Sequence, residues 1–291
     1  MMKNIRLSAL LLAALSGSLM AQTVATVNGK AIDSSEIDAV VQNLKQGNPQ
    51  LQDGPQLREE ITRRLVVSTA VAQEARRLKL DQSNEFKQIS DQALANAKKD
   101  GADKKPTFKQ EWALFQNDLL NRAFMSDVLQ KNPVGDADVN KAYQDMSAYY
   151  QGTQEIQLGE IMTRNEADAK KAYDELKAKK SFKTVATKYT INEQAKKTGG
   201  IAPGYIPLKD LQQTEPGLFE AIGNLPKGSY SEPMRSQDGA LFAIFYVNDK
   251  RNVQLPALNQ MKEGLAVQLE QDRVAAAVDS LMQKAKVQPA K

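Results

Sequence analysis

The chain opens with a short extended pattern and then changes to helical spacing. Val24 and Val27 lie on a short extended segment, and Asn28-Gly29 is typical of a tight turn. Asp33, followed three residues later by Glu36, forms a capping box. The pattern therefore predicts a hairpin and then a helix that runs through Leu44.

A second and a third helix are predicted from apolar residues at steps of three and four. Asp53 and Pro55 begin the second helix, and its apolar stripe comprises Leu57, Ile61, Leu65, Val71, Ala75 and Leu78. The sequence KKDGADKKP, which ends at Pro106, separates it from the third helix. There Thr107 and Gln110 form another predicted capping box, and the apolar spacing continues through Trp112, Phe115, Leu119, Phe124 and Leu129.

The pattern changes character in the middle of the chain. Asn132-Pro133 and Gly135 end the third helix, and Asp136 is expected to cap a short fourth one. After Gln151-Gly152-Thr153 the order is strand, helix, helix, glycine-rich turn, helix and strand. This order predicts a small α+β domain.

The segment after Leu255-Pro256 is again helical, with one apolar stripe formed by Leu258, Met261, Leu265, Leu269, Val274, Val278, Leu281 and Ala285. A lone helix cannot fold by itself, so we expect its apolar face to pack on the N-terminal helices. A homodimer through a coiled coil of this helix is the alternative, although the stripe drifts from a strict heptad.

Composition excludes many chemistries, because the chain has no histidine and no cysteine. Catalytic triads, cysteine nucleophiles and typical zinc sites cannot be built without them. We therefore expect no cofactor, no metal and no disulfide. A reaction without a charged intermediate, or no reaction, is the expectation.

The first 21 residues are typical of a secretory signal, with Lys3 and Arg6 before a short apolar run and cleavage expected after Ala21. An uncleaved membrane anchor is the alternative, but the run is short for a span. Without Lys3 and Arg6, 37 basic residues face 35 acidic ones, a net charge of +2. We therefore expect a periplasmic protein that binds no nucleic acid and is not inserted in a membrane after cleavage.

The segment from Glu155 to Arg251 resembles the parvulin family of peptidyl-prolyl cis/trans isomerases, or rotamases. Its motifs, in the order of the family, are EIQLGEIM, the helix from Phe182 to Tyr189, Gly199-Gly200, Phe219-Glu220-Ala221, LPKGSYSEPMRS and the strand from Leu241 to Val247. The flanking VATVNGKAID with its helices, and the returning C-terminal helix, are similar to the chaperone parts of exported parvulins of the SurA and PrsA type.

The resemblance implies an α+β fold in which helical N- and C-terminal chaperone segments pack together and a parvulin-like domain, a small antiparallel sheet surrounded by helices, is inserted between them. The expected parts are a signal peptide (1–21), the N-terminal chaperone part (22–134), a connecting helix and linker (135–154), the parvulin-like domain (155–251) and the C-terminal helix (252–291).

Carried over by position, the resemblance implies a catalytic site of Glu160, Asn192, Phe219 and Leu241. Glu160 and Leu241 stand where the family has histidine, with Ala243 the alternative to Leu241, and Asn192 replaces an aspartate or cysteine. Phe219 matches the phenylalanine that contacts proline. Three of them have a structural alternative: Glu160 as an edge glutamate paired with a lysine, Asn192 as an ordinary turn residue, and Phe219 as a core aromatic. Glu215 falls where the family has methionine or leucine.

The implied function is a periplasmic folding factor that binds unfolded exported or outer-membrane polypeptides and isomerises X-Pro bonds. Rotation about an amide breaks no bond, so it needs neither histidine nor cysteine. Two alternatives stay open: a non-catalytic chaperone that keeps the parvulin fold as a binding module, and a structural protein of the envelope.

Overall fold

The computed structural model describes residues 22–289, so the expected signal peptide lies outside the described residues. Contacts divide the chain into two compact units. The described residues up to Val134, together with those from Val267, form the helical unit, and Gly135–Ala266 form the sheet unit. Within 22–289, no helix is long and apolar enough to cross a membrane.

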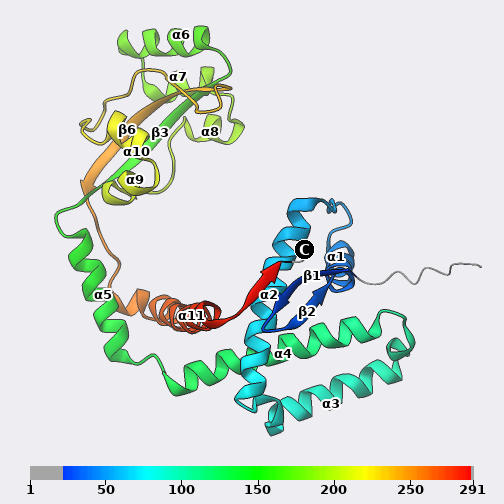
Figure 1. Ribbon diagram of the computed structural model, residues 1–291. Helices are drawn as coiled ribbons and strands as arrows, with labels where there is room; N and C mark the ends of the chain where they lie inside the picture. Colours follow the sequence, from blue (N-terminus) through cyan, green and yellow to red (C-terminus); the bar gives the residue numbers. More distant parts are fainter. Residues whose placement is uncertain (1–21, 290–291) are drawn as a thin grey trace, which may run out of the picture. The chain divides into compact units, whose positions relative to one another are not determined.

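A three-stranded antiparallel sheet joins the two ends of the helical unit. Strands β1 (Thr23–Val27) and β2 (Lys30–Asp33) form the predicted hairpin, with positive φ at Asn28 and Gly29. Strand β7 (Val287–Pro289) pairs with the other edge of β1, giving the order β2-β1-β7 (Figure 1). Residues from both ends of the chain therefore share one sheet.

The first helix begins at the predicted capping box, and the second begins at Pro55 as predicted, with Gly54 rather than Asp53 as its N-cap. In α1 (Ser34–Gly47), the Asp33 N–H donates to Glu36 Oε1 at 3.2 Å, as expected for a capping box. Helix α2 (Pro55–Arg77) starts with proline at its first position, where a missing N–H costs nothing.

The prediction placed no boundary between Leu78 and the break at 98–106, and this was wrong. Lys79 has a φ of 60° and ends the helical path, and a 3₁₀ turn, η1 (Leu80–Gln82), follows. A separate helix, α3 (Asn84–Lys99), then starts because Ser83 Oγ accepts the Phe86 N–H at 3.1 Å. The turn η2 (Ala102–Lys104) follows α3.

Two further predicted caps are also corrected. At the start of α4 (Phe108–Lys131), the Thr107 hydroxyl donates to Glu111 Oε1 at 2.7 Å instead of capping the helix with Gln110. Helix α5 (Asp136–Tyr150) has Gly135, not Asp136, as its N-cap, and the Gly135 N–H donates to Asp138 Oδ2 at 2.9 Å. In both cases the helix exists as predicted, but the hydrogen bonds at its start differ from the predicted ones.

The last part of α11 (Leu258–Lys284), from Val267 onward, completes the core of the helical unit. Leu281 packs against both core clusters of this unit, and it is joined there by Ala277, Val278, Met282 and Ala285. This confirms that the C-terminal helix packs on the N-terminal helical set. Apolar burial stabilises such contacts by about 25 cal/mol per Å².

The sheet unit is built on two long antiparallel strands, β3 (Gln154–Thr163) and β6 (Phe242–Asn252). Two short strands extend it to the order β4-β3-β6-β5, namely β4 (Ile206–Pro207) and β5 (Met234–Arg235). The α+β fold class is confirmed. The helices of this unit besides α5 are α6 (Glu166–Lys177), α7 (Phe182–Tyr189), α8 (Glu193–Thr198), α9 (Leu208–Thr214) and α10 (Pro216–Ile222).

The two faces of this sheet carry different helices, because alternate residues of a strand point to opposite faces. Ile161 and Ile244 face α6 and α7. Ile156, Leu158 and Val247 face α9 and α10 (Figure 1). The second of these faces, called here the Phe219 face, also carries Glu160 by the alternation along β3.

Candidate functional site

Glu160 is an acid among apolar residues on the Phe219 face. Along β3 its neighbours on this face are Leu158 and Met162, and the residue opposite it on β6 is Phe245. Its backbone N–H donates to the carbonyl of Gly200 at 2.8 Å, which fixes the strand on its other side. These backbone hydrogen bonds fix the position of Glu160 in the sheet, among apolar neighbours.

The Glu160 carboxylate is half-buried and has no hydrogen bond or ion pair within the described chain, residues 22–289. Burial raises its pKa above the ordinary glutamate value, since a charge is less stable away from water. The alternative expected from the sequence, a glutamate paired with a nearby lysine, is not what the structure has.

The double glycine is required by how closely the chain passes β3. Gly199 and Gly200 have φ of 65° and 81°, a region that residues with a Cβ rarely adopt. A Cβ on Gly200 would lie 2.8 Å from the carbonyl oxygen of Glu160 and 2.7 Å from the Cβ of Ala186. These glycines let the loop approach the strand that carries Glu160.

Phe219 lies on α10 and is partly buried against the core of the Phe219 face. The same cluster includes Phe245, the residue opposite Glu160. A Cβ on Gly223 would lie 2.8 Å from the Phe219 ring, so the ring packs directly on that glycine. The structure therefore brings Phe219 and Glu160 to one face of the sheet, where Phe245 lies opposite Glu160 and packs against the same core cluster as Phe219.

Asn192 has a clear structural task. It is the N-cap of α8, and its side-chain oxygen accepts the N–H groups of Gln194 and Ala195 at 3.0 and 3.1 Å. The residue is exposed. This cap accounts for its amide oxygen, and a role in the site stays a prediction.

Leu241 lies immediately before β6, outside the ladder, where its N–H donates to Ser236 Oγ at 2.9 Å. Ala243, the alternative position, lies inside the ladder opposite Met162. A bulge also falls on β6, because Gln157 pairs with Asp249 while Leu158 pairs with Val247. This extra residue is one reason why the sequence allowed two registers. The role of Leu241 is still a prediction.

Two features of this face were missed by sequence reasoning. Phe245 was placed in a strand but not linked to Glu160, because strand pairing joins residues distant in sequence. Glu215 was noted only as a departure; it is exposed at the junction of α9 and α10. The apolar run from Leu241 to Val247 predicted the strand but not the residue that Phe245 would face.

The helical unit contains three apolar hollows of about 400, 450 and 450 Å³. Each has one large apolar side chain that stays well exposed: Leu44 in the first at 40%, Met125 in the second at 39% and Ile89 in the third at 42%. We name them the Leu44, Met125 and Ile89 hollows. Nothing in the sequence pattern alone distinguished these residues from core positions.

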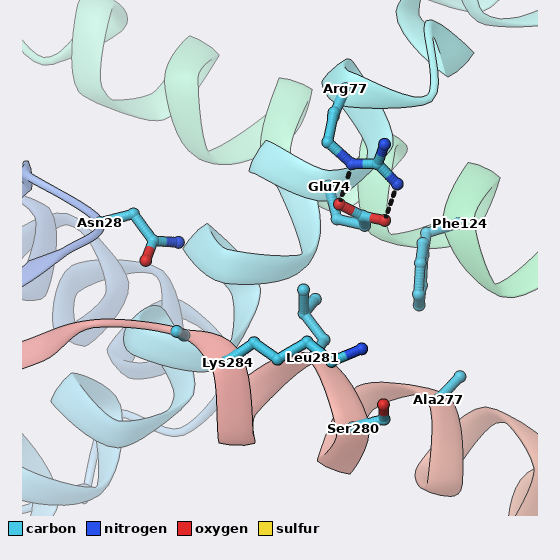
Figure 2. Close-up of a pocket in the computed structure, with 9 residues that line it drawn as sticks. Asn28, Glu74, Arg77, Phe124, Ala277, Ser280, Leu281 and Lys284 are labelled. Atoms are coloured by element: carbon cyan, nitrogen blue, oxygen red, sulfur yellow. Dashed lines mark hydrogen bonds and ion pairs between the residues drawn. The ribbon is translucent and has the colours of Figure 1, made fainter.

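Figure 2 shows a fourth pocket of the helical unit, of about 540 Å³, between α2, α4 and the end of α11. Its acid, Glu74, is bound by Arg77 through two hydrogen bonds of 2.7 Å, and these hold the pKa of Glu74 below its usual value. Phe124 and Leu281 supply apolar surface beside this ion pair. Its charges largely satisfy each other.

No cluster of His, Cys, Asp or Glu able to hold a metal ion occurs between residues 22 and 289. The expectation that the protein needs no cofactor stays a prediction. On the Phe219 face, the described residues offer apolar surface beside the carboxylate of Glu160.

Comparison with known proteins identifies both parts of the chain. Residues 134–263 match the PPIC-type PPIASE domain, and residues 7–124 match the SurA-like N-terminal domain. A probable parvulin-type peptidyl-prolyl cis-trans isomerase of Bordetella bronchiseptica is 31% identical over 271 residues, covering 92% of this chain and 93% of the relative. The foldase protein PrsA of Clostridium perfringens is 26% identical, covering 86% and 80%.

Among solved structures, the foldase protein PrsA of Streptococcus pneumoniae is similar with a TM-score of 0.40 and 14% identity, covering 90% of this chain and 92% of that one. The relative from Bordetella spans nearly the whole chain. Together with the two family matches, it shows that this chain belongs to the parvulin-type peptidyl-prolyl cis-trans isomerases with a SurA-like N-terminal domain.

Proposed function

We propose that the protein is an exported folding factor whose helical unit binds unfolded polypeptides and whose sheet unit isomerises X-Pro bonds in them. The observation that carries the binding role is the set of three apolar hollows, each with an exposed Leu44, Met125 or Ile89. An unfolded chain presents scattered apolar side chains, and several shallow hollows can take them in many registers.

The hollows also explain how weak contacts could add up. Filling one hollow buries about one side chain, which is worth about 1.5 to 3 kcal/mol. Once one client residue is bound, the next is held near a second hollow at high effective concentration. The Leu44 and Met125 hollows share Arg64 and Ser68 in their linings, so one extended segment can reach both.

This binding role is tested by replacing Met125 with glutamate. A client side chain that fills the hollow would have to remove water from this charge, which is unfavourable. We therefore expect binding of an unfolded outer-membrane protein to weaken by about tenfold. The measurement is suppression of its aggregation on dilution from denaturant, titrated with the folding factor.

The matched control is Val267→Glu. Val267 is 47% exposed in the same unit and does not line the three hollows. Equal loss in both variants would show that surface hydrophobicity in general is responsible. No suppression by the parent protein would favour the structural envelope protein instead.

The isomerase role is supported by the Phe219 face. Amide rotation has a barrier of about 18 to 20 kcal/mol, and a surface that removes water from the amide and fits a twisted form lowers it. Phe219 offers a partly buried ring for proline beside an apolar sheet. The proposed site keeps Glu160, Phe219, Asn192 and Leu241, of which the first two share a face.

Replacement of Phe219 by alanine is expected to lower kcat/KM on a short proline peptide by roughly tenfold to a hundredfold, as loss of one apolar contact implies. Exchange measurements by NMR report the rotation directly. Phe219→Leu keeps most of the apolar volume and shows whether the alanine variant merely loses its fold.

A second function, a non-catalytic binding module, has its own support. Asn192 is used as a helix cap, and Leu241 lies outside the ladder of the sheet. If the parent protein fails to accelerate rotation in any proline peptide, the sheet unit is this binding module.

An extracytoplasmic location, specifically the periplasm, completes the proposal. It is supported by the sequence of the first 21 residues and by the SurA-like N-terminal domain. Mature protein beginning at Gln22 in the periplasmic fraction is the expected result, and retention in the cytoplasm would contradict it.

A further inference from the structure

The unpaired carboxylate of Glu160 has a cost that the described chain does not offset. Its neighbours along and across the ladder, Leu158, Met162 and Phe245, are all apolar, and their side chains offer it no hydrogen bond. A half-buried charge of this kind destabilises a fold unless a partner is supplied. A partner that arrives with the client would satisfy it.

The cations around this face are already engaged. Lys250 of β6 donates to two backbone carbonyl oxygens at 2.9 and 3.1 Å, and Lys209 of α9 donates to the carbonyl oxygen of Tyr149. Lys227, after α10, pairs with Asp249 at 2.7 Å. Neither β3 nor α10 carries a basic residue. These parts of the sheet unit therefore present no unengaged cation to Glu160.

The Phe219 face also suits the rest of a basic side chain. Lysine and arginine have long apolar stems that lie on apolar surface while the charged end reaches a partner. Phe245 packs against the core cluster of the Phe219 face and lies opposite Glu160 on the sheet, so it can support such a stem. Proline on Phe219 and a cation at Glu160 would then occupy neighbouring parts of one face.

We infer that Glu160 is a specificity residue that binds the cationic side chain of a lysine or arginine flanking the client's proline, so that the sheet unit selects basic X-Pro segments. This inference rests on the proposed isomerase or binding role of the Phe219 face. It assigns Glu160 to substrate choice.

The experiment uses the full chain and proline peptides that differ at the flanking residues only. Lysine, its uncharged isostere norleucine, and glutamate are placed next to proline, on either side. Both kcat/KM for rotation and the equilibrium Kd of labelled peptides are measured. Because a hydrogen bond to a charged group is strong, we expect lysine to exceed norleucine by about tenfold in at least one position.

Glu160→Gln tests the assignment, and Glu220→Gln is its matched control, an exposed acid on the same helix as Phe219. The lysine preference should vanish in the first variant and persist in the second. Phe219→Ala should weaken all peptides alike. A preference that survives Glu160→Gln, or equal lysine and norleucine values in the parent, overturns the inference.

The same measurements separate failure of the proposed isomerase role from failure of the specificity role. If no peptide is accelerated but lysine peptides bind more tightly and lose this advantage in Glu160→Gln, the isomerase is wrong and the specificity role stands. If peptides are accelerated without a lysine preference, the isomerase stands and the specificity role is wrong. No binding of any proline peptide contradicts both.

Discussion

At the residue scale, Glu160 links stability to function. Burial raises its pKa above the ordinary glutamate value. In the unfolded chain the group has its ordinary pKa of 4.5, so ionisation at neutral pH favours unfolding. Glu160 therefore lowers the stability of the folded state at neutral pH, as residues at binding sites often do.

Glu160→Gln is therefore expected to stabilise the sheet unit at pH 7. The sign follows from linkage: as pH rises through the raised pKa, the parent loses stability and the glutamine variant does not. Below the ordinary pKa of 4.5 both forms are neutral and the difference should disappear. Hydrogen exchange of the β3 amides at several pH values measures this.

Glu220→Gln again serves as the control, since it removes an exposed acid of the same unit. Equal changes in both variants would point to net charge. A difference between parent and Glu160→Gln that grows toward low pH would contradict the assigned burial.

At the scale of elements, the sequence predicted most helices and strands correctly and their ends less well. The helix from Phe182 to Tyr189, expected from the family resemblance, agrees with α7 at both ends, and Ser181 Oγ accepts the Thr184 N–H at its start. The helix α3 was missed, since Lys79 adopts a left-handed φ that only glycine or asparagine usually signals. Apolar spacing continues on both sides of such a break and cannot show it.

The caps at Thr107 and Gly135 show the same limit. Several donors and acceptors near the start of a helix compete for the same hydrogen bonds. The Thr107 hydroxyl donates to Glu111, and the Gly135 N–H donates to Asp138. Which of these pairs forms depends on the angle at which the chain enters the helix, and this angle is set by packing.

At the scale of the whole molecule, the C-terminal segment is expected to be needed for the helical unit. Leu281 packs in both clusters of that unit but is only partly buried. Leu281→Ala should lower the free energy of unfolding of this unit by about 1 to 2 kcal/mol, below the range for fully buried leucine. The single tryptophan, Trp112 on α4, reports this transition by fluorescence in urea.

Val267→Ala is the comparison, because an exposed residue should change stability by less than about 0.5 kcal/mol. Hydrogen exchange in β3 should be unchanged in Leu281→Ala, since the sheet unit has its own core. An unchanged tryptophan transition would mean that the helix adds nothing to the helical unit.

The sequence by itself determined the fold class, the family and the absence of histidine chemistry, because periodicity, ordered motifs and composition are local or additive properties. Only the tertiary structure decided that Glu160 meets Phe245 and shares a face with Phe219, and that Leu44, Met125 and Ile89 stay exposed in hollows. Strand register and helix packing join residues far apart in sequence. Their contacts depend on the whole fold, which no local pattern contains.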